Sequence, residues 1–181
     1  YKENNVEIEK NIAILMLSAI ISDTLLFKSP TCTKEDIKVA EELNKIANIN
    51  IQEYGLDMLK AGTDVSDLSA DELIGLDAKE VTIGNYKTII AQVNTASIPD
   101  MLKRKEELEI SINKKIEEKG LDLFFLAITD IINSNSQVIA LGKEAKLVEK
   151  SYNVTLEENT AFLPGIVSRK KQIIPVLTQN A

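Results

Sequence analysis

The sequence contains no histidine and only one cysteine, Cys32, among its 181 residues. The missing histidines exclude Ser-His-Asp catalysis, Cys-His catalysis and any histidine-containing metal site built by this chain alone. One cysteine can form neither an intrachain disulfide nor a cysteine-rich zinc site, so we expect a reducing compartment, the cytoplasm. With no histidine to activate its thiol, Cys32 is interpreted as a structural residue.

Basic residues are also in the minority. Lys and Arg total 21 against 28 Asp and Glu, which gives a net charge of -7. Affinity for nucleic acid rests on neutralising phosphates with Lys and Arg, so this balance argues against nucleic acid as a partner. It leaves room for a small, locally basic anion site. The most apolar run, residues 12–21, is far shorter than the roughly 20 residues that span a bilayer. It indicates a buried helix, and no membrane partner is expected.

Glycine-rich phosphate loops are absent as well. Neither GxxxxGK[ST] nor GxGxxG occurs, which argues against a self-contained nucleotide enzyme. The opening YKENNVEIEK is charged and resembles neither a signal peptide nor a transit peptide. Since the first methionine is Met16, we expect the natural start to lie upstream and this chain to be a fragment.

The first third of the chain is predicted to be helical, over residues 5–22, 34–47 and 51–61. Thr33 and Asp36 form a candidate capping box before the second helix. Small and acidic residues follow at 62–69, GTDVSDLS, and predict a linker between two domains. Ser69 and Glu72 form a second candidate capping box.

Beyond the linker the hydrophobic period changes to that of strands. Val, Ile, Thr and Tyr enrich two segments around the turn pair Gly84-Asn85, which predicts a hairpin. A charged amphipathic helix should follow at 98–119, and Gly120 suits its left-handed cap. The predicted strands are 80–83, 86–94, 121–129, 137–142 and a broken strand within 166–178, with a short helix at 143–150. This order predicts an α/β domain with a mixed sheet.

Three places could carry chemistry. Arg169 and Lys170 belong to a run of three cations, and an arginine fork beside a mobile lysine suits phosphate oxygens. From the pattern alone, a solvated basic turn or cations protecting an edge strand is the favoured explanation of this run. Asp23 follows the most apolar helix, where a carboxylate opposes the helix dipole, although aspartate also starts turns. Lys79 by itself resembles any surface lysine.

Longer stretches are more specific than these single positions. In order along the chain stand LMLSAIISDTLLFKSPTCT, LDAKEVTIGNYK, IAQVNT, LFFLAITDI and VSRKKQIIPVLT. Together they closely resemble the family II inorganic pyrophosphatases, the manganese-dependent enzymes of the DHH phosphoesterase superfamily. The resemblance extends over the whole chain.

The resemblance implies a fold, metals and a substrate. Residues 1–64 would be the C-terminal helical part of a metal-binding DHH domain, and residues 65–181 a smaller C-terminal substrate-binding α/β domain. Asp23 matches a manganese ligand, Lys79 matches a substrate-binding lysine, and Arg169 and Lys170 match a substrate-binding pair. The full enzyme would use two Mn²⁺ ions, with Mg²⁺ able to accompany the substrate, and would hydrolyse pyrophosphate to two phosphates. The resemblance leaves open whether the full-length enzyme is a homodimer.

The departure from the family is that most of its metal ligands are absent, including its Asp-His-His motif. We therefore expect this chain alone to be inactive. Two alternatives remain at this point: a non-catalytic anion-binding module, and another DHH-type phosphoesterase such as an exopolyphosphatase.

Overall fold

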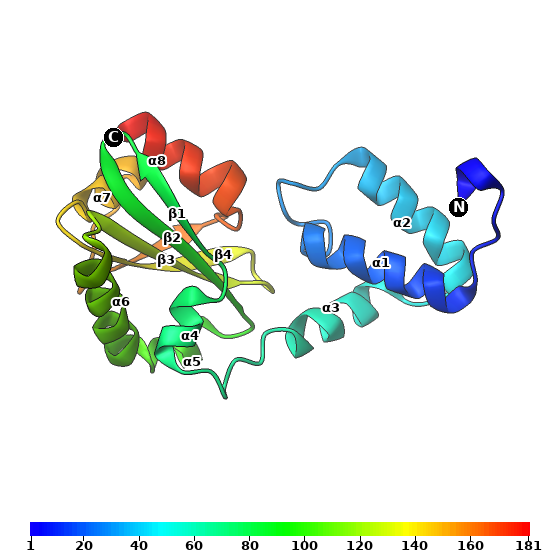
Figure 1. The fold of residues 1–181 in the computed structure, drawn as a ribbon. Coiled ribbons are helices and arrows are strands. Elements are labelled where there is room, and N and C mark those ends of the chain that lie inside the picture. The colour runs from blue at the N-terminus through cyan, green and yellow to red at the C-terminus, as the bar shows by residue number, and fades with distance from the viewer. The chain divides into compact units, whose positions relative to one another are not determined.

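The structure, a computed structural model, describes the chain from Tyr1 to Ala181 apart from the side chain of Lys2. The chain forms two compact units, Tyr1–Gly62 and Thr63–Ala181, which are described here one at a time (Figure 1). Within the described part of the chain, no helix is both long enough and apolar enough to span a membrane.

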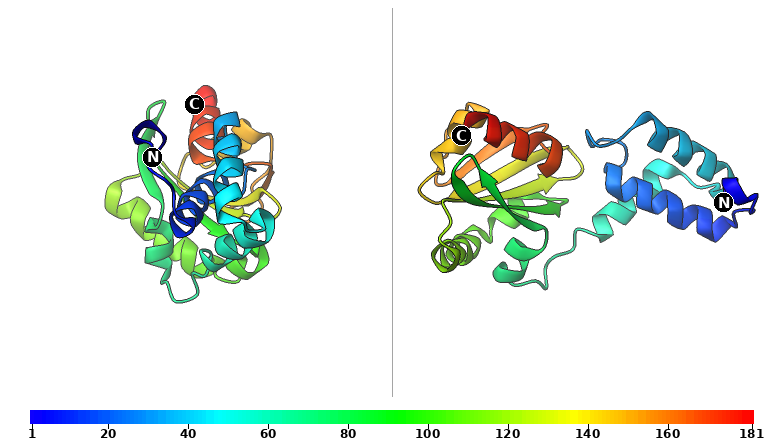
Figure 2. Two further views of the ribbon diagram at one scale, coloured as in Figure 1. Left: turned by 90° about the vertical axis from the view of Figure 1, so that its right-hand side faces the viewer. Right: turned by 45° about the horizontal axis from the view of Figure 1, so that its top comes forward.

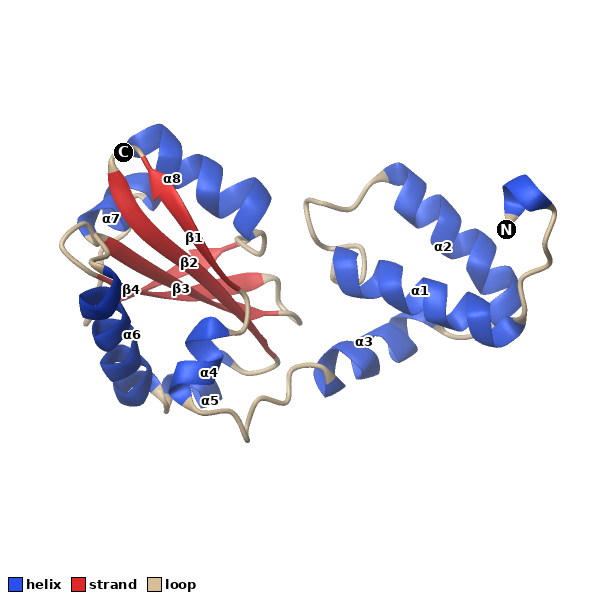
Figure 3. Ribbon diagram, viewed as in Figure 1, coloured by secondary structure: helices blue, strands red, loops and turns tan.

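The first unit is built from helices, and Figure 3 draws no strand in it. The predicted capping box is confirmed, because Asp36 accepts from the backbone N–H of Thr33 at 2.8 Å and Thr33 Oγ1 accepts from that of Asp36 at 3.2 Å. The three predicted helices are confirmed too, although the first begins at Lys10 and not at residue 5. The elements are η1 (Lys2–Asn4), α1 (Lys10–Thr24), α2 (Lys34–Ala47) and α3 (Ile51–Ala61). Their shared core holds Ala13, Leu17, Ile21, Leu26, Ala40, Leu43 and Ala47.

A left-handed turn ends α1. Leu25, Leu26 and Phe27 have φ angles of 48°, 54° and 66°, a region that costs roughly 1–2 kcal/mol per non-glycine residue. Several hydrogen bonds hold the turn; among them, the N–H of Leu26 donates to the carbonyl of Ile21 at 2.9 Å, and that of Phe27 donates to Thr24 Oγ1 at 3.2 Å. The leucines are buried, so apolar burial offsets the backbone strain. The turn fixes the direction in which the chain leaves α1.

The second unit contains one five-stranded sheet with its strands in chain order. Only β2 and β3 are parallel, and each other neighbouring pair is antiparallel. All eight residues of β3 are buried, which makes it the central strand. The strands are β1 (Ala78–Ile83), β2 (Tyr86–Thr95), β3 (Leu123–Asp130), β4 (Asn135–Leu141) and β5 (Thr160–Pro164). The predicted mixed-sheet α/β fold is confirmed.

Helices cover both faces of this sheet (Figures 1 and 2). One face packs on α4 (Ala70–Gly75), α5 (Ile98–Leu102) and α6 (Lys105–Lys119), and the other on α7 (Lys146–Tyr152) and α8 (Ile174–Asn180). Because side chains alternate along a strand, Ile89 enters the core under α6 while Ile90 enters the core under α8. We call these the α6 face and the α8 face of the sheet.

The basic run near the C-terminal end was assigned the wrong conformation by the sequence pattern. Residues 166–178 do not form a strand: they contain a π-helical turn, η2 (Arg169–Ile173), which leads into α8. Ser168 caps this turn, since its Oγ accepts from the N–H of Lys171 at 3.3 Å. Ile173 and Leu177 lie one helical turn apart and are both fully buried, so the apolar spacing is helical after all. The fifth strand instead lies earlier, at Thr160–Pro164.

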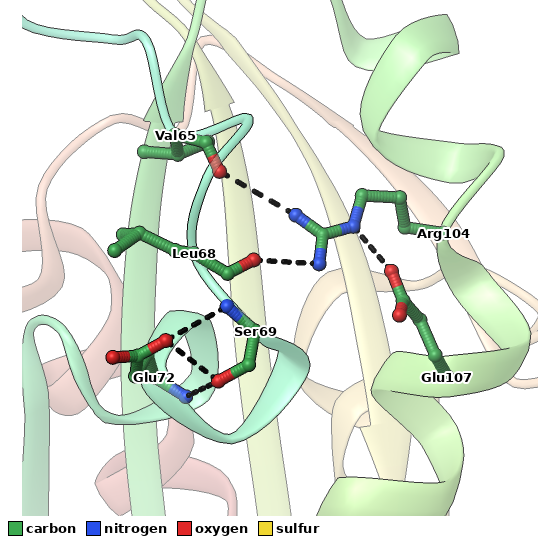
Figure 4. A network of polar contacts seen from close by, with 6 residues as sticks. All are labelled: Val65, Leu68, Ser69, Glu72, Arg104 and Glu107. Carbon is green, nitrogen blue, oxygen red and sulfur yellow. Dashed lines mark hydrogen bonds and ion pairs between the residues drawn. The ribbon is translucent and has the colours of Figure 1, made fainter.

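The predicted helical segment 98–119 is confirmed at both ends but is divided in two, since the chain turns at Lys103 and Arg104 between α5 and α6. The guanidinium of Arg104 donates to the carbonyl oxygens of Leu68 at 2.8 Å and Val65 at 3.5 Å, and it pairs with Glu107 (Figure 4). These tertiary contacts override the local helix propensity. They also fasten the second half of the 62–69 segment to the second unit.

Candidate anion-binding site

Lys79 lies on the α8 face of the sheet. It precedes Val81 and Ile83 by two and four residues on β1, and both of these pack in the core under α8. Because alternate residues of a strand share a face, Lys79 points to the same side as η2 and α8. Its neighbour Glu80 lies on the opposite face, where it pairs with Lys119 of α6 at 2.7 Å.

Arg169 joins the basic turn to the start of β1. Its Nη2 lies 2.8 Å from the Asp77 carboxylate, and its Nη1 donates to the backbone carbonyl of the same residue. The same Nη1 lies 3.5 Å from the carbonyl oxygen of Ile90, which is the Cα partner of Lys79 across the β1–β2 ladder. The structure therefore brings Arg169 beside Lys79, although 90 positions separate them in the sequence.

Lys170 stands next to Arg169 on η2 and is exposed. The run is helical and not part of a strand as predicted, and Arg169 folds back onto β1. Among the described residues, no carboxylate lies within ion-pair distance of Lys79 or Lys170. We call these three residues the cation cluster: Arg169 is anchored to β1, and Lys79 and Lys170 are exposed to solvent.

Half-buried polar side chains lie below this cluster, and the sequence pattern did not single them out. Gln92 of β2 contacts the loop before η2, and Gln172 of η2 folds back onto the same loop. The signal for Gln92 was a lone amide inside the apolar run IIAQV. Gln172 belongs to the quoted stretch SRKKQ, in which only the charges drew a prediction. Asp77 gave no signal of its own, because an exposed aspartate before a strand is ordinary.

Asp23 belongs to the first unit, where it is exposed near the end of α1. It lines a hollow of about 390 Å³ together with Ile20, Thr24, Thr31 and Asp36. The Asp36 carboxylate is committed to its cap, since hydrogen bonds from the backbone and hydroxyl of Thr33 lower its pKa. Among the described residues, no three His, Cys, Asp or Glu side chains gather into a group that could hold a metal ion. One free carboxylate does not fit a two-manganese site, so this chain's residues alone do not make one.

Cys32 follows Thr31, a residue that lines this hollow, and its side chain is half-buried. Burial, with a smaller contribution from the nearby Asp36 charge, raises the pKa of its thiol. The thiol therefore stays protonated near neutral pH, which suits the structural role expected of it.

Solved and curated proteins resemble the chain along nearly its whole length. The manganese-dependent inorganic pyrophosphatase of Bacillus subtilis (strain 168) is 62% identical over 178 residues, which are 98% of this chain and 58% of that protein. A probable manganese-dependent inorganic pyrophosphatase of Bacillus velezensis matches equally well, at 62% over 178 residues. The chain thus spans 58% of the length of these relatives. They confirm the resemblance inferred from the sequence.

The fold matches as well. The crystal structure of a putative family II inorganic pyrophosphatase of Methanococcus jannaschii superimposes with a TM-score of 0.86 at 39% identity, over 97% of this chain and 57% of that one. The model of the DHHA2 domain family matches residues 56–180, which include the whole sheet, the basic turn and the last helix. This match covers well over half of the sequence, and the chain belongs to the DHHA2 domain family.

Proposed function

We propose that this chain is the substrate-binding portion of a manganese-dependent inorganic pyrophosphatase, which hydrolyses pyrophosphate to two phosphates. In this proposal residues 65–181 are the substrate-binding domain, and residues 1–64 are the C-terminal helical part of the metal-binding domain. The observation that carries the proposal is that Arg169, next to Lys170 on η2, reaches the ladder partner of Lys79 from a segment that is remote in sequence. The names of the relatives support the reaction and the metal.

The chemistry of the cluster suits a dianionic or more highly charged phosphate. The guanidinium of Arg169 presents a planar donor fork, of which one edge is occupied by Asp77 and the backbone. Lys79 and Lys170 are both exposed and supply mobile point charges. In this proposal the three cations neutralise charge on both phosphoryl groups, in the bound substrate and in the transition state.

The metal ligands of this enzyme are proposed to come from sequence beyond this chain. Asp23 is the one ligand assigned within it, in agreement with its exposed carboxylate above an open polar hollow. The preferred substrate is pyrophosphate and not a long polyphosphate. Three cations match two phosphoryl groups, and β1 carries no cation besides Lys79 that would extend the site for a longer chain of phosphates.

Phosphate release from pyrophosphate in the presence of Mn²⁺ tests the proposal. The comparison is between this chain and a version extended to the length of the Bacillus relatives. Turnover is expected only in the extended version, with Arg169→Ala raising KM and lowering kcat. Turnover by the 181 residues alone would refute the metal assignment. Binding without turnover in the extended version would favour a non-catalytic anion-binding module, and faster release from long polyphosphate would favour an exopolyphosphatase.

A further inference from the structure

A polar row crosses the sheet directly under the loop that leads to Arg169. The side-chain amide of Gln92 on β2 donates to Thr129 Oγ1 on β3 at 3.1 Å, and Thr129 shares a hydrogen bond of 2.9 Å with Ser136 on β4. Thr129 and Ser136 are opposite each other in the β3–β4 ladder, and both are fully buried. Hydroxyls and amides in such a site persist only where each finds a partner, so this row has a defined geometry.

The row is connected to the loop by two further hydrogen bonds. Gln92 Nε2 also donates to the carbonyl of Val167 at 3.0 Å, and Ser136 Oγ donates to the carbonyl of Ile166 at 2.7 Å. These two peptide groups lie just before Ser168, the residue that caps η2. The sheet therefore holds the loop by its carbonyl oxygens.

Gln172 holds the same loop from the other side. Its Oε1 accepts from the N–H groups of Val167 at 3.0 Å and Ser168 at 3.1 Å, and its Nε2 donates to the carbonyl of Gly165 at 2.7 Å. One side chain thus satisfies three peptide groups of a loop that has no strand partner at these positions. The loop is clamped between Gln92 below and Gln172 above.

We propose that Gln92 and Gln172 are positioning residues that set Arg169 and Lys170 at the distance from Lys79 that a diphosphate requires. This inference rests on the proposed function. Arg169 contacts the carbonyl of Ile90, which lies two residues from Gln92 on the same face of β2. One strand therefore contacts both the Arg169 side chain and the loop before η2. Misplacing a bound group by about 1 Å costs on the order of a hundredfold in rate, so a clamp of this kind matters to affinity and turnover.

A double-mutant cycle in the extended protein tests the inference. Gln172→Met keeps the size of the side chain and removes its three hydrogen bonds, and Gln92→Met is the second variant in case the first does not fold. KM for pyrophosphate should rise on the order of tenfold in either single variant while the melting temperature stays above that of the assay. In an Arg169→Ala/Lys170→Ala background the same substitution should change KM by less than about twofold, because the groups it positions are gone.

The outcomes separate the two proposals. Equal KM factors in both backgrounds, or an unchanged KM, would overturn the positioning role while the pyrophosphatase proposal stands. An extended protein that never releases phosphate would overturn both. Gln179→Met is the matched control, since Gln179 is an exposed glutamine on α8, and it should leave KM unchanged.

Amide hydrogen exchange gives a readout that needs no turnover. In this chain the N–H groups of Val167 and Ser168 should exchange faster in Gln172→Met than in the parent. Protection that is unaltered in Gln172→Met would show that the clamp does not hold the loop and would overturn the inference.

Discussion

Single residues in this protein are constrained most tightly where backbones approach each other. Gly142 follows β4 with a φ of 115°, and a Cβ there would lie 2.4 Å from the carbonyl oxygen of Asp122. Both the φ angle and the contact require glycine. Gly75, at the end of α4, has an ordinary backbone conformation, and a Cβ added there would meet nothing within 4 Å.

Gly142→Ala should therefore lower the free energy of unfolding by at least about 2 kcal/mol, because the methyl group collides with backbone that cannot move aside. Gly75→Ala is the control and should be neutral or stabilising by about 0.5 kcal/mol, since alanine favours the helix. Urea denaturation of the two variants beside the parent chain measures both values. An equal stability of the two variants would contradict the close approach.

The residue scale also shows where sequence reasoning reaches its limit. The roles of Arg169 and Lys79 come from a resemblance and stay predictions. The contacts of Asp77 and Gln172 gave no signal in the sequence, because Asp77 pairs with the guanidinium of Arg169 and Gln172 reaches the carbonyl of Gly165, and only the fold brings these groups together. A side chain's partners depend on the tertiary fold, which spacing along the chain does not reveal.

At the scale of elements, local signals worked best where the chemistry is local. Both capping boxes were predictable because donor and acceptor lie three residues apart. The helix at the C-terminal end was missed because Pro175 and the cations obscured its spacing, whereas Pro in a first helical turn is tolerated. The break between α5 and α6 depends on Arg104 reaching a distant loop, which no short sequence window contains.

The capping box of α4 makes stability depend on pH. Hydrogen bonds from the hydroxyl and then the backbone of Ser69 lower the pKa of Glu72 below its ordinary 4.5. A depressed pKa contributes stability that is fully present above the ordinary value and is lost as pH falls through the lowered one. The parent chain should thus melt higher than Glu72→Gln at pH 7, and the gap should shrink below about pH 4.5. Calorimetry between pH 3 and 7 measures this difference in melting temperature. A gap that is constant with pH would argue against the box.

A second prediction at this scale concerns Arg104 and the linker, residues 62–69. Arg104→Met removes charge-assisted hydrogen bonds to Leu68 and Val65 and should lower the free energy of unfolding by about 1.5–3 kcal/mol. Peptides that contain residues 65–68 should also exchange their amide hydrogens faster, while those of β3 stay protected. Hydrogen exchange read by mass spectrometry measures this effect. Arg104→Lys, which keeps the charge and loses the fork, should lie between the parent and the methionine variant. Unchanged exchange in the linker would mean that the guanidinium does not fasten it.

At the scale of the whole molecule, the change of hydrophobic period beyond the linker predicted an α/β region after a helical one. A mixed sheet was predictable from the sequence, but the pairing of its strands was not, because the parallel pairing of β2 with β3 depends on the crossover through α5 and α6. The compact units divide at Gly62, and the two core clusters of the second unit draw all their residues from Thr63–Ala181.

A fragment that comprises residues 63–181 should therefore fold by itself. It contains every strand and both sheet-covering layers, so its thermal unfolding should be a single cooperative transition. Circular dichroism and calorimetry of the isolated fragment check this expectation. A broad, non-cooperative melt would show that the second unit depends on Tyr1–Gly62 for its stability.

The complete burial of β3 has a consequence for the unfolded chain. Leu123–Thr129 carries neither charge nor proline, and it combines two phenylalanines with leucine and isoleucine. Such a segment, once exposed, favours intermolecular cross-β association. Asp122 and Asp130 flank it and act as charged gatekeepers until β2 and β4 have paired on either side. Any protein product that stops before Asn135 would present this strand with one edge permanently open, and inclusion bodies are its expected fate.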